Sequence, residues 1–309
     1  MSSGSEDSVV LSQLETEQRC PSTIMMDTLS TSSLLELLHN HSLNAFTAVQ
    51  TVLPQLTYLV DEIVNRLSSS GRLFYVGAGT SGRLGVLDAS ECPPTFGVDP
   101  EMVQGIIAGG SKALTHAVEG AEDRPELGSE SIDEYGITDK DVVIGLASSG
   151  RTPFVIGALL RAKEKGAYTA AVVNVSKSPL SHIVHLTVHA ITGPEALTGS
   201  TRLNAGTAQK LILNLITTGT MIKLGKVYEN LMVDVHATNY KLKDRAARIV
   251  KEATSIDLNF ALEALLKADG DCKTAIVMIM NNTGPEEARE QISKNAGNIR
   301  NAIHSLSVK

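Results

Sequence analysis

Cysteine is scarce in this 309-residue sequence: three residues, at positions 20, 92 and 272, lie far apart and form no Cys-x-x-Cys pair. An odd and scattered set of this kind is typical of reduced thiols and argues against a zinc site. We therefore expect a cytoplasmic protein that holds no metal.

Long apolar runs and basic clusters are also missing. No apolar run approaches the ~20 residues that a membrane-spanning helix needs, and the first ten residues, MSSGSEDSVV, lack the basic start of a signal peptide. The net charge of −7 is modest and no Lys/Arg run forms a basic face. Neither a membrane nor a nucleic acid is expected as a partner.

Short apolar segments alternate with helical patterns between residues 73 and 190. Several of these strands are apolar on both faces, as a parallel sheet covered by helices requires. We therefore expect an α/β fold, a three-layer αβα, doubly wound parallel sheet. The expected strands are Leu73–Val76, Val103–Ala108, Val142–Ala147, Thr169–Val175 and Val184–Ala190, and the expected helices among them are Arg83–Asp88, Lys112–Val118 and Phe154–Lys165.

The flanking sequence is predicted to be mostly helical. Residues 1–60 are expected to form a flexible tail, an extended arm through Thr16–Pro21 and N-terminal helices, residues 61–235 the sheet domain, and residues 236–309 a small C-terminal helical region. An amphipathic stripe over Val49–Leu67 predicts a helix that Pro54 either kinks or begins. A broadly apolar helix near Thr201–Lys226 would pack against the sheet or against a second subunit.

A glycine-rich loop, Gly77-Ala-Gly-Thr-Ser-Gly82, directly follows the first expected strand and precedes a helix. This order of elements favours phosphate, because backbone N–H groups and the helix dipole point at the anion. The loop formally matches the G-x-G-x-x-G pattern of dinucleotide sites. No acidic residue ends the second strand to hold a ribose, so a nucleotide is disfavoured.

A second loop with hydroxyl side chains, Ser148-Ser-Gly-Arg-Thr152, ends the strand at Val142–Ala147 and precedes another helix. Each loop alone could serve only to cap its helix. In a parallel sheet both loops follow the carboxyl ends of their strands, at the same edge of the sheet, so the two loops can bind one phosphate together.

This pair of loops resembles the sugar isomerase (SIS) domain family of phosphosugar-binding proteins. The resemblance implies that Gly79, Thr80 and Ser81 of the first loop and Ser148, Ser149 and Thr152 of the second bind the sugar phosphate. Many relatives carry a further serine at the position of Ala147, so one hydroxyl contact is missing here.

Longer strings resemble the N-acetylmuramic acid 6-phosphate etherase family within this group. They are Gly77–Thr95, Ala117–Asp123, Leu197–Lys210 and Asn230–Val235, and the likeness extends from about Thr16 to the C-terminal region. It implies cleavage of the D-lactyl ether of N-acetylmuramic acid 6-phosphate without a cofactor or metal, by a homodimer. The N-terminal arm departs most, with Cys20 where relatives usually carry asparagine.

Two carboxylates fall on the catalytic positions of that family, Glu91 and Glu122. The resemblance implies that Glu91 protonates the departing lactate and that Glu122 is the base at C2, although the two roles could be exchanged or shared. Among neighbouring residues, Glu119, Asp123 and Glu126 are equal contenders to Glu122 on sequence alone. Glu195 and Arg202 flank a loop at the end of a strand, where either could contact the substrate.

Other functions remain open at this stage. The same phosphate loops would serve an aldose–ketose phosphosugar isomerase, or a non-catalytic sugar-phosphate sensor that regulates a kinase. His182, His185 and His189 are close in sequence, but only the last two share a face of a strand. Packing or surface roles are therefore expected for them.

Overall fold

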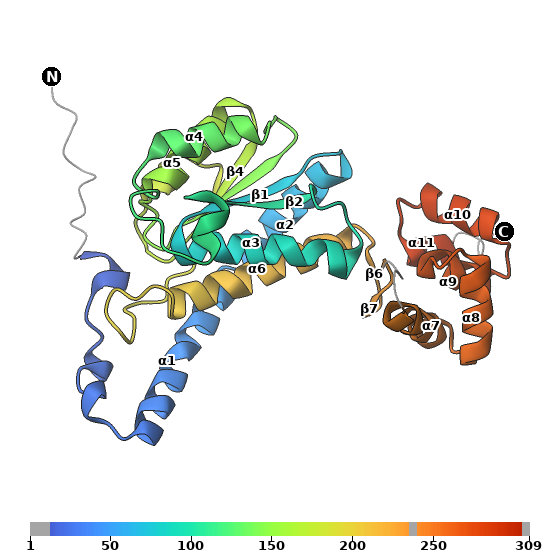
Figure 1. Cartoon of the computed structure of the whole chain (residues 1–309), viewed down its shortest axis with the longest axis horizontal. Coiled ribbons are helices and arrows are strands. Elements are labelled where there is room, and N and C mark those ends of the chain that lie inside the picture. Colours follow the sequence, from blue (N-terminus) through green and yellow to red (C-terminus); the bar gives the residue numbers. More distant parts are fainter. Residues whose placement is uncertain (1–12, 235–239, 305–309) are drawn as a thin grey trace. The chain divides into compact units, whose positions relative to one another are not determined.

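The computed structural model describes residues 13–234 and 240–304. These residues form two compact units (Figure 1), one from the described parts of 1–89 and 101–217 and the other from those of 90–100 and 218–309. Helices α3 (Gly79–Phe96) and α6 (Asn204–Lys223) contribute to both units. The division of the chain at residues 60 and 235 stays a prediction.

A five-stranded parallel sheet in the order β2-β1-β3-β4-β5 forms the centre of the first unit. The doubly wound sheet predicted from the sequence is thus confirmed. Every residue of β1 and β3 is buried, because both faces of the sheet are covered by helices. The strands are β1 (Leu73–Gly77), β2 (Val103–Ile107), β3 (Val142–Leu146), β4 (Tyr168–Val173) and β5 (Leu186–His189).

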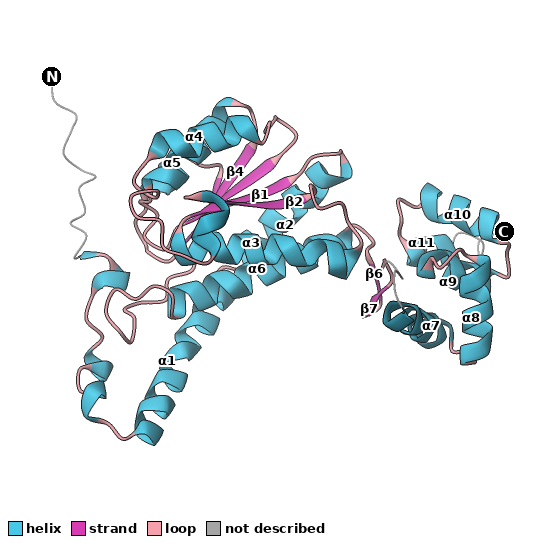
Figure 2. Cartoon of the chain, in the orientation of Figure 1, coloured by secondary structure: helices cyan, strands magenta, loops and turns pink. Residues whose placement is uncertain are grey.

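Helices cover the sheet on both sides (Figure 2). Phe74, Val76 and Val143 pack with α4 (Pro125–Glu134) and α5 (Pro153–Glu164) in one buried cluster. On the other face, Tyr75 and Leu146 lie close to Gly85 of α3, and α2 (Leu53–Ser68) also lies there.

Two helix predictions in this region are wrong. The segment expected as a helix at Lys112–Val118 contains only the 3-10 helix η5 (Gly110–Leu114), after Gly109 and Gly110 take positive φ values of 85° and 63°. Helix α3 continues well beyond the expected end at Asp88 and includes Pro93 and Pro94 in its last turn.

The N-terminal arm is extended over only part of the predicted segment, at Gln18 and Cys20. It folds into the 3-10 helices η2 (Glu15–Glu17), η3 (Pro21–Thr23) and η4 (Met26–Thr28) before α1 (Thr31–Thr51). Ser30 caps α1 by accepting a hydrogen bond from the Ser33 N–H at 3.3 Å, and Pro54 lies in the first turn of α2. The expected tail at residues 1–12 falls outside the described residues.

Helices make up most of the second unit. Its short antiparallel hairpin, β6 (Val227–Tyr228) with β7 (Leu231–Met232), was not predicted. Pro285 begins one of its helices. The helices are α7 (Tyr240–Thr254), α8 (Leu258–Lys267), α9 (Cys272–Asn281), α10 (Pro285–Lys294) and α11 (Ile299–His304). No helix in the described residues is both long enough and apolar enough to cross a bilayer.

Candidate functional site

The two hydroxyl-bearing loops begin side by side. Strands β1 and β3 are direct neighbours, with Gly77 aligned with Leu146 at their carboxyl ends. From this pair the chain leaves toward opposite edges, since β2 lies beyond β1 and β4 beyond β3. Ligands of doubly wound sheets bind at such a reversal of strand order.

The first loop is tight and leads directly into a helix. A Cβ at Gly77 would lie 2.7 Å from the backbone nitrogen of Gly82, so a larger residue cannot fit. Gly79, Thr80 and Ser81 form the first turn of α3, where N–H groups have no partner within the helix. Ser81 is buried and Thr80 half-buried, so the backbone donors together with the two hydroxyls form a candidate anion site.

The second loop depends on a glycine in a left-handed conformation. Gly150 has a φ of 64°, and a Cβ there would lie 1.9 Å from the Ser178 hydroxyl oxygen. Ser149 Oγ accepts a hydrogen bond from the Arg151 N–H at 3.3 Å, and Thr152 is the N-cap residue of α5. The buried Arg151 Nε has no hydrogen-bond partner among residues 13–234 and 240–304, which makes this cation a candidate phosphate ligand that the sequence reasoning missed.

A buried amide network lies behind the second loop. Gln209 of α6 donates from Nε2 to Ser148 Oγ at 3.1 Å and to Asn174 Oδ1 at 3.0 Å. Gln209 and Asn174 are both fully buried. Neither was predicted as a site residue, because each is adjacent to Ser148 only in the folded chain.

Glu122 is attached to the second loop by its backbone. Its carbonyl oxygen accepts a hydrogen bond from the Phe154 N–H at 3.0 Å, at the start of α5, while its side chain is exposed. Arg83 of α3 holds the preceding segment by donating to the carbonyl oxygens of Ala113 at 2.9 Å and His116 at 3.3 Å. The fold therefore brings the backbone of Glu122 beside the start of α5, the helix that directly follows Ser148–Thr152.

Comparison with known proteins places this architecture in a family. The model of the glucokinase regulatory protein N-terminal SIS domain matches residues 55–163, and the SIS domain model matches residues 126–218. An N-acetylmuramic acid 6-phosphate etherase of Pectobacterium atrosepticum is 53% identical over 95% of this chain and 97% of the relative. The chain belongs to the N-acetylmuramic acid 6-phosphate etherase family.

A second member of the family, from Clostridium beijerinckii, is 49% identical over 98% of this chain and all of the relative. Among solved structures, phosphoheptose isomerase GmhA from Neisseria gonorrhoeae is 13% identical, and the match covers 62% of this chain and 98% of that one with a TM-score of 0.49. Similarity at this level carries no information on activity.

Glu91, the other catalytic residue that the family resemblance implies, lies exposed on α3. It belongs to the second compact unit, whereas Glu122 and both loops belong to the first. The catalytic assignment of either residue stays a prediction.

Glu195 and Arg202 occupy different environments. The Glu195 carboxylate is fully buried and accepts hydrogen bonds from the backbone N–H groups of Asn204 and Ala205, both at 2.9 Å. It therefore caps α6. A Cβ at Gly206, in the first turn of that helix, would lie 3.4 Å from the Thr80 methyl group. The Arg202 side chain is exposed. Contact of either with substrate stays a prediction.

Two of the three histidines make internal contacts. His185 Nδ1 lies 3.0 Å from the Thr169 backbone nitrogen and 2.9 Å from its hydroxyl. His189 Nδ1 lies 2.9 Å from the Val175 carbonyl oxygen. Among the residues that the structure describes, no cluster of three or more His, Cys, Asp or Glu side chains could hold a metal.

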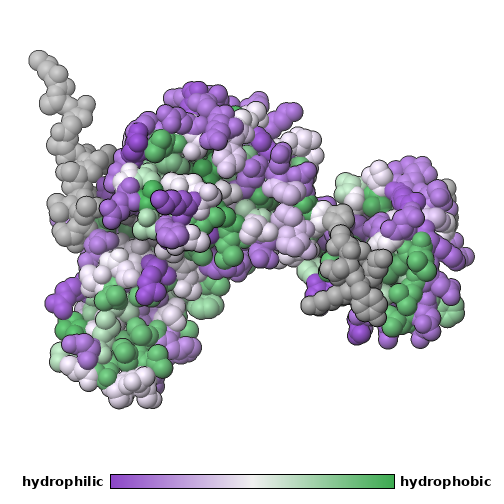
Figure 3. Space-filling model, in the orientation of Figure 1, coloured by the Kyte–Doolittle hydropathy of each residue, from purple (hydrophilic) through white to green (hydrophobic). Residues whose placement is uncertain are grey.

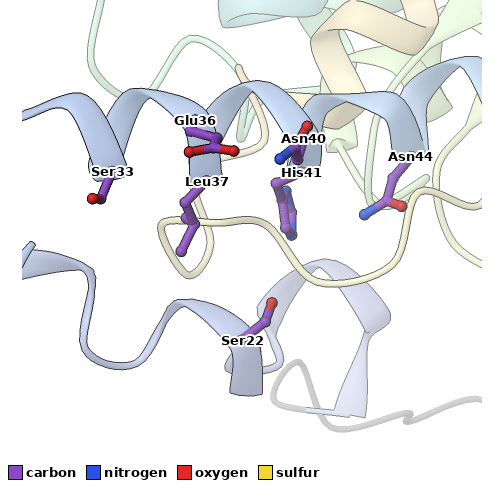
Figure 4. A pocket seen from close by; sticks show the side chains of 7 residues that line it. All are labelled: Ser22, Ser33, Glu36, Leu37, Asn40, His41 and Asn44. Atoms are coloured by element: carbon purple, nitrogen blue, oxygen red, sulfur yellow. The ribbon is translucent and has the colours of Figure 1, made fainter.

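A pocket of about 510 Å³ lies between the arm and α1 (Figure 4). His41 connects it to the site, because Asn204 at the start of α6 donates to His41 Nδ1 at 2.9 Å. On its other side, His41 Nε2 lies 3.5 Å from the Cys20 sulfur. The pocket is lined by Ser22, Ser33, Glu36, Leu37, Asn40, His41 and Asn44.

Proposed function

We propose that this protein cleaves the D-lactyl ether of N-acetylmuramic acid 6-phosphate, giving N-acetylglucosamine 6-phosphate and D-lactate. The observation that carries the proposal is the pair of hydroxyl loops on adjacent strands, with Glu122 hydrogen-bonded to the start of α5. Near-full-length relatives bearing the name of this etherase support the choice of reaction.

In this proposal the phosphate binds between the two loops. The N–H groups and hydroxyls of Gly79, Thr80 and Ser81 would donate from one side, and Ser148, Ser149 and Thr152 from the other. Donors fixed by helix starts need no rearrangement when the anion arrives. Glu195 and Arg202 are proposed to act at the sugar or the lactyl group, the first by fixing the start of α6.

The chemistry requires a base and an acid, and neither a metal nor a nicotinamide. In the open-chain sugar the C1 aldehyde acidifies the C2 hydrogen, so Glu122 can remove that proton as the bond from C3 to the ether oxygen breaks. Glu91 protonates the departing oxygen, which leaves as D-lactate. Water then adds at C3 of the resulting double bond and a proton returns to C2, completing the product.

The test is release of D-lactate from N-acetylmuramic acid 6-phosphate by the wild type and three variants. Glu91→Gln and Glu122→Gln should fold normally and lose at least about 100-fold in turnover, the range for removal of a general acid or base. Glu126→Gln is the matched control, since Glu126 is an exposed neighbour paired with Arg124 at 2.6 Å. Near-normal turnover in either test variant would remove that residue from the mechanism.

A cytoplasmic homodimer is part of the proposal. Large apolar side chains are exposed over the arm and α1 (Figure 3), among them Met25 at 63%, Leu35 at 61% and Phe46 at 55% exposed. A second copy would cover this face. Light scattering should give twice the chain mass for the wild type and a monomer for Leu35→Glu/Phe46→Glu; a monomeric wild type at micromolar concentration would refute the dimer.

A further inference from the structure

The amide network behind Ser148 has one arrangement that satisfies its donors and acceptors. Asn174 follows β4 and donates from Nδ2 to the Ala190 carbonyl oxygen at 2.9 Å. A carbonyl oxygen only accepts hydrogen bonds, so the amide of Asn174 cannot be flipped. Its Oδ1 therefore faces Gln209 as an acceptor.

The orientation of Asn174 fixes that of Gln209. Facing an acceptor at 3.0 Å, Gln209 must present its Nε2 group, and the second hydrogen on that nitrogen is directed to Ser148 Oγ at 3.1 Å. The Asn174 N–H also donates to the Ser148 carbonyl oxygen at 2.9 Å. The backbone and the hydroxyl oxygen of Ser148 are thus both held by residues from outside its loop.

A serine hydroxyl that accepts from Gln209 keeps its own hydrogen for another acceptor. We propose that Gln209 is a positioning residue that holds Ser148 as a hydrogen-bond donor to the substrate phosphate. This inference rests on the proposed phosphosugar function and adds to it a residue that acts through Ser148 without touching the substrate.

The other end of the Gln209 amide supports this assignment. Its Oε1 is buried and has no hydrogen-bond partner among the described residues, a situation that costs free energy in a protein interior. Since the oxygen contributes no protein hydrogen bond, the contribution of this side chain lies in its two N–H donors. Both serve the network that ends at Ser148.

Two variants test the role. Gln209→Met keeps the length of the side chain and removes its donors. Gln209→Glu keeps the shape, but its carboxylate accepts the Ser148 hydrogen and so takes it from the phosphate. Thr220→Val is the matched control, a substitution at another fully buried position of α6 whose hydroxyl has no described partner.

The wild type and variants are compared by KM and kcat for D-lactate release, and by calorimetric binding of N-acetylglucosamine 6-phosphate and of N-acetylglucosamine. Loss of one hydrogen bond to a charged group predicts about tenfold weaker binding of the phosphorylated sugar and a similar rise in KM for Gln209→Met. Glutamate should be worse, kcat should change by less than about twofold, and Thr220→Val should match the wild type. In a Ser148→Ala background, Gln209→Met should have no further effect.

The outcomes separate this inference from the reaction itself. An active wild type whose Gln209 variants keep its KM overturns the positioning role and leaves the reaction intact. A wild type that binds the sugar phosphate without releasing D-lactate, with binding weakened in the variants, overturns only the reaction. Additive effects of Gln209→Met and Ser148→Ala, or unfolding of both Gln209 variants, would make the network structural and overturn the inference.

Discussion

Asp141 connects the amino ends of β1 and β3, the two strands whose carboxyl ends carry the phosphate loops. Its carboxylate is 2% exposed and pairs with Arg72 Nη2 at 2.9 Å. It also accepts hydrogen bonds from the Arg72 backbone N–H at 2.9 Å, from Arg72 Nε at 3.2 Å, and from the Thr138 N–H at 2.9 Å. Both carboxylate oxygens therefore face at least two donors.

Asp141→Asn cannot reproduce this arrangement. Whichever oxygen becomes an NH₂ group then faces N–H donors, so at least two charge-assisted hydrogen bonds are lost. The Arg72 guanidinium, whose side chain is 27% exposed, also loses its charged partner. Breaking a fully buried ion pair at one partner costs about 3–5 kcal/mol, and the partial exposure of Arg72 puts this change at the lower end, about 3 kcal/mol. For a chain of this size the melting temperature should fall by about 10 °C.

The assay is thermal and urea unfolding of Asp141→Asn beside Asp133→Asn. Asp133 also pairs with an arginine, Arg161, at 3.0 Å, but its side chain is 44% exposed, so its loss should cost at most about 1 kcal/mol. Equal destabilisation by the two substitutions would refute the reasoning that burial and the number of donors set the cost.

The effect of Asp141 should also depend on pH. Burial raises the pKa of the Asp141 carboxyl, but hydrogen bonds from Arg72 and Thr138 outweigh burial and hold the pKa below its usual value. A lowered pKa in the folded state stabilises the fold above the unfolded value of about 3.9, and this contribution disappears as the pH falls through the folded pKa. The difference between wild type and Asp141→Asn should shrink on acidification below about pH 4.

Three other buried groups, one carboxyl and two thiols, give two further tests. Burial raises the pKa of Asp88 despite hydrogen bonds from Tyr75 and Thr217, so its ionised form is disfavoured in the fold; Asp88→Asn should gain stability relative to wild type as pH rises above about 4, measured by urea unfolding from pH 4 to 8. Burial raises the pKa of Cys272 to about 12, whereas for Cys20 hydrogen bonds led by Ser22 outweigh burial and lower it. Iodoacetamide at pH 7.5 should therefore label Cys20 first by mass spectrometry; earlier labelling of Cys272 would contradict this order.

The sheet and the loops could be predicted because their signals are local. A strand such as Leu73–Gly77 is buried on both faces, so it appears as a continuous apolar run. The helix starts at Pro54 and Pro285 are marked by a proline in the first turn. Helix α4 also has a proline in its first turn, Pro125. The sequence did not predict this helix because most of its residues are polar and only Gly128 and Ile132 are buried.

The amide network could not be predicted from local patterns. Asn174, Gln209 and Ser148 lie on three elements, and their contact depends on strand order and on the direction of α6. Glu122 illustrates the same limit, since on sequence pattern Glu119, Asp123 and Glu126 are its equals and only the family resemblance selects it. In the fold, the Glu122 carbonyl oxygen accepts a hydrogen bond from the Phe154 N–H. That bond places the backbone of Glu122 and leaves its side chain exposed.

The exposure of Glu122 bears on how the proposed reaction is controlled. A carboxylate that the protein does not enclose is not held against C2 by packing, so alignment must come from the substrate. The proposed phosphate donors are the most rigidly held groups of the site. They lie at helix starts whose positions are fixed by the register of β1 and β3, and Ser148 is also held by Gln209. Binding energy at the phosphate would then be used to hold C2 near the base, which raises kcat/KM through the affinity for the substrate.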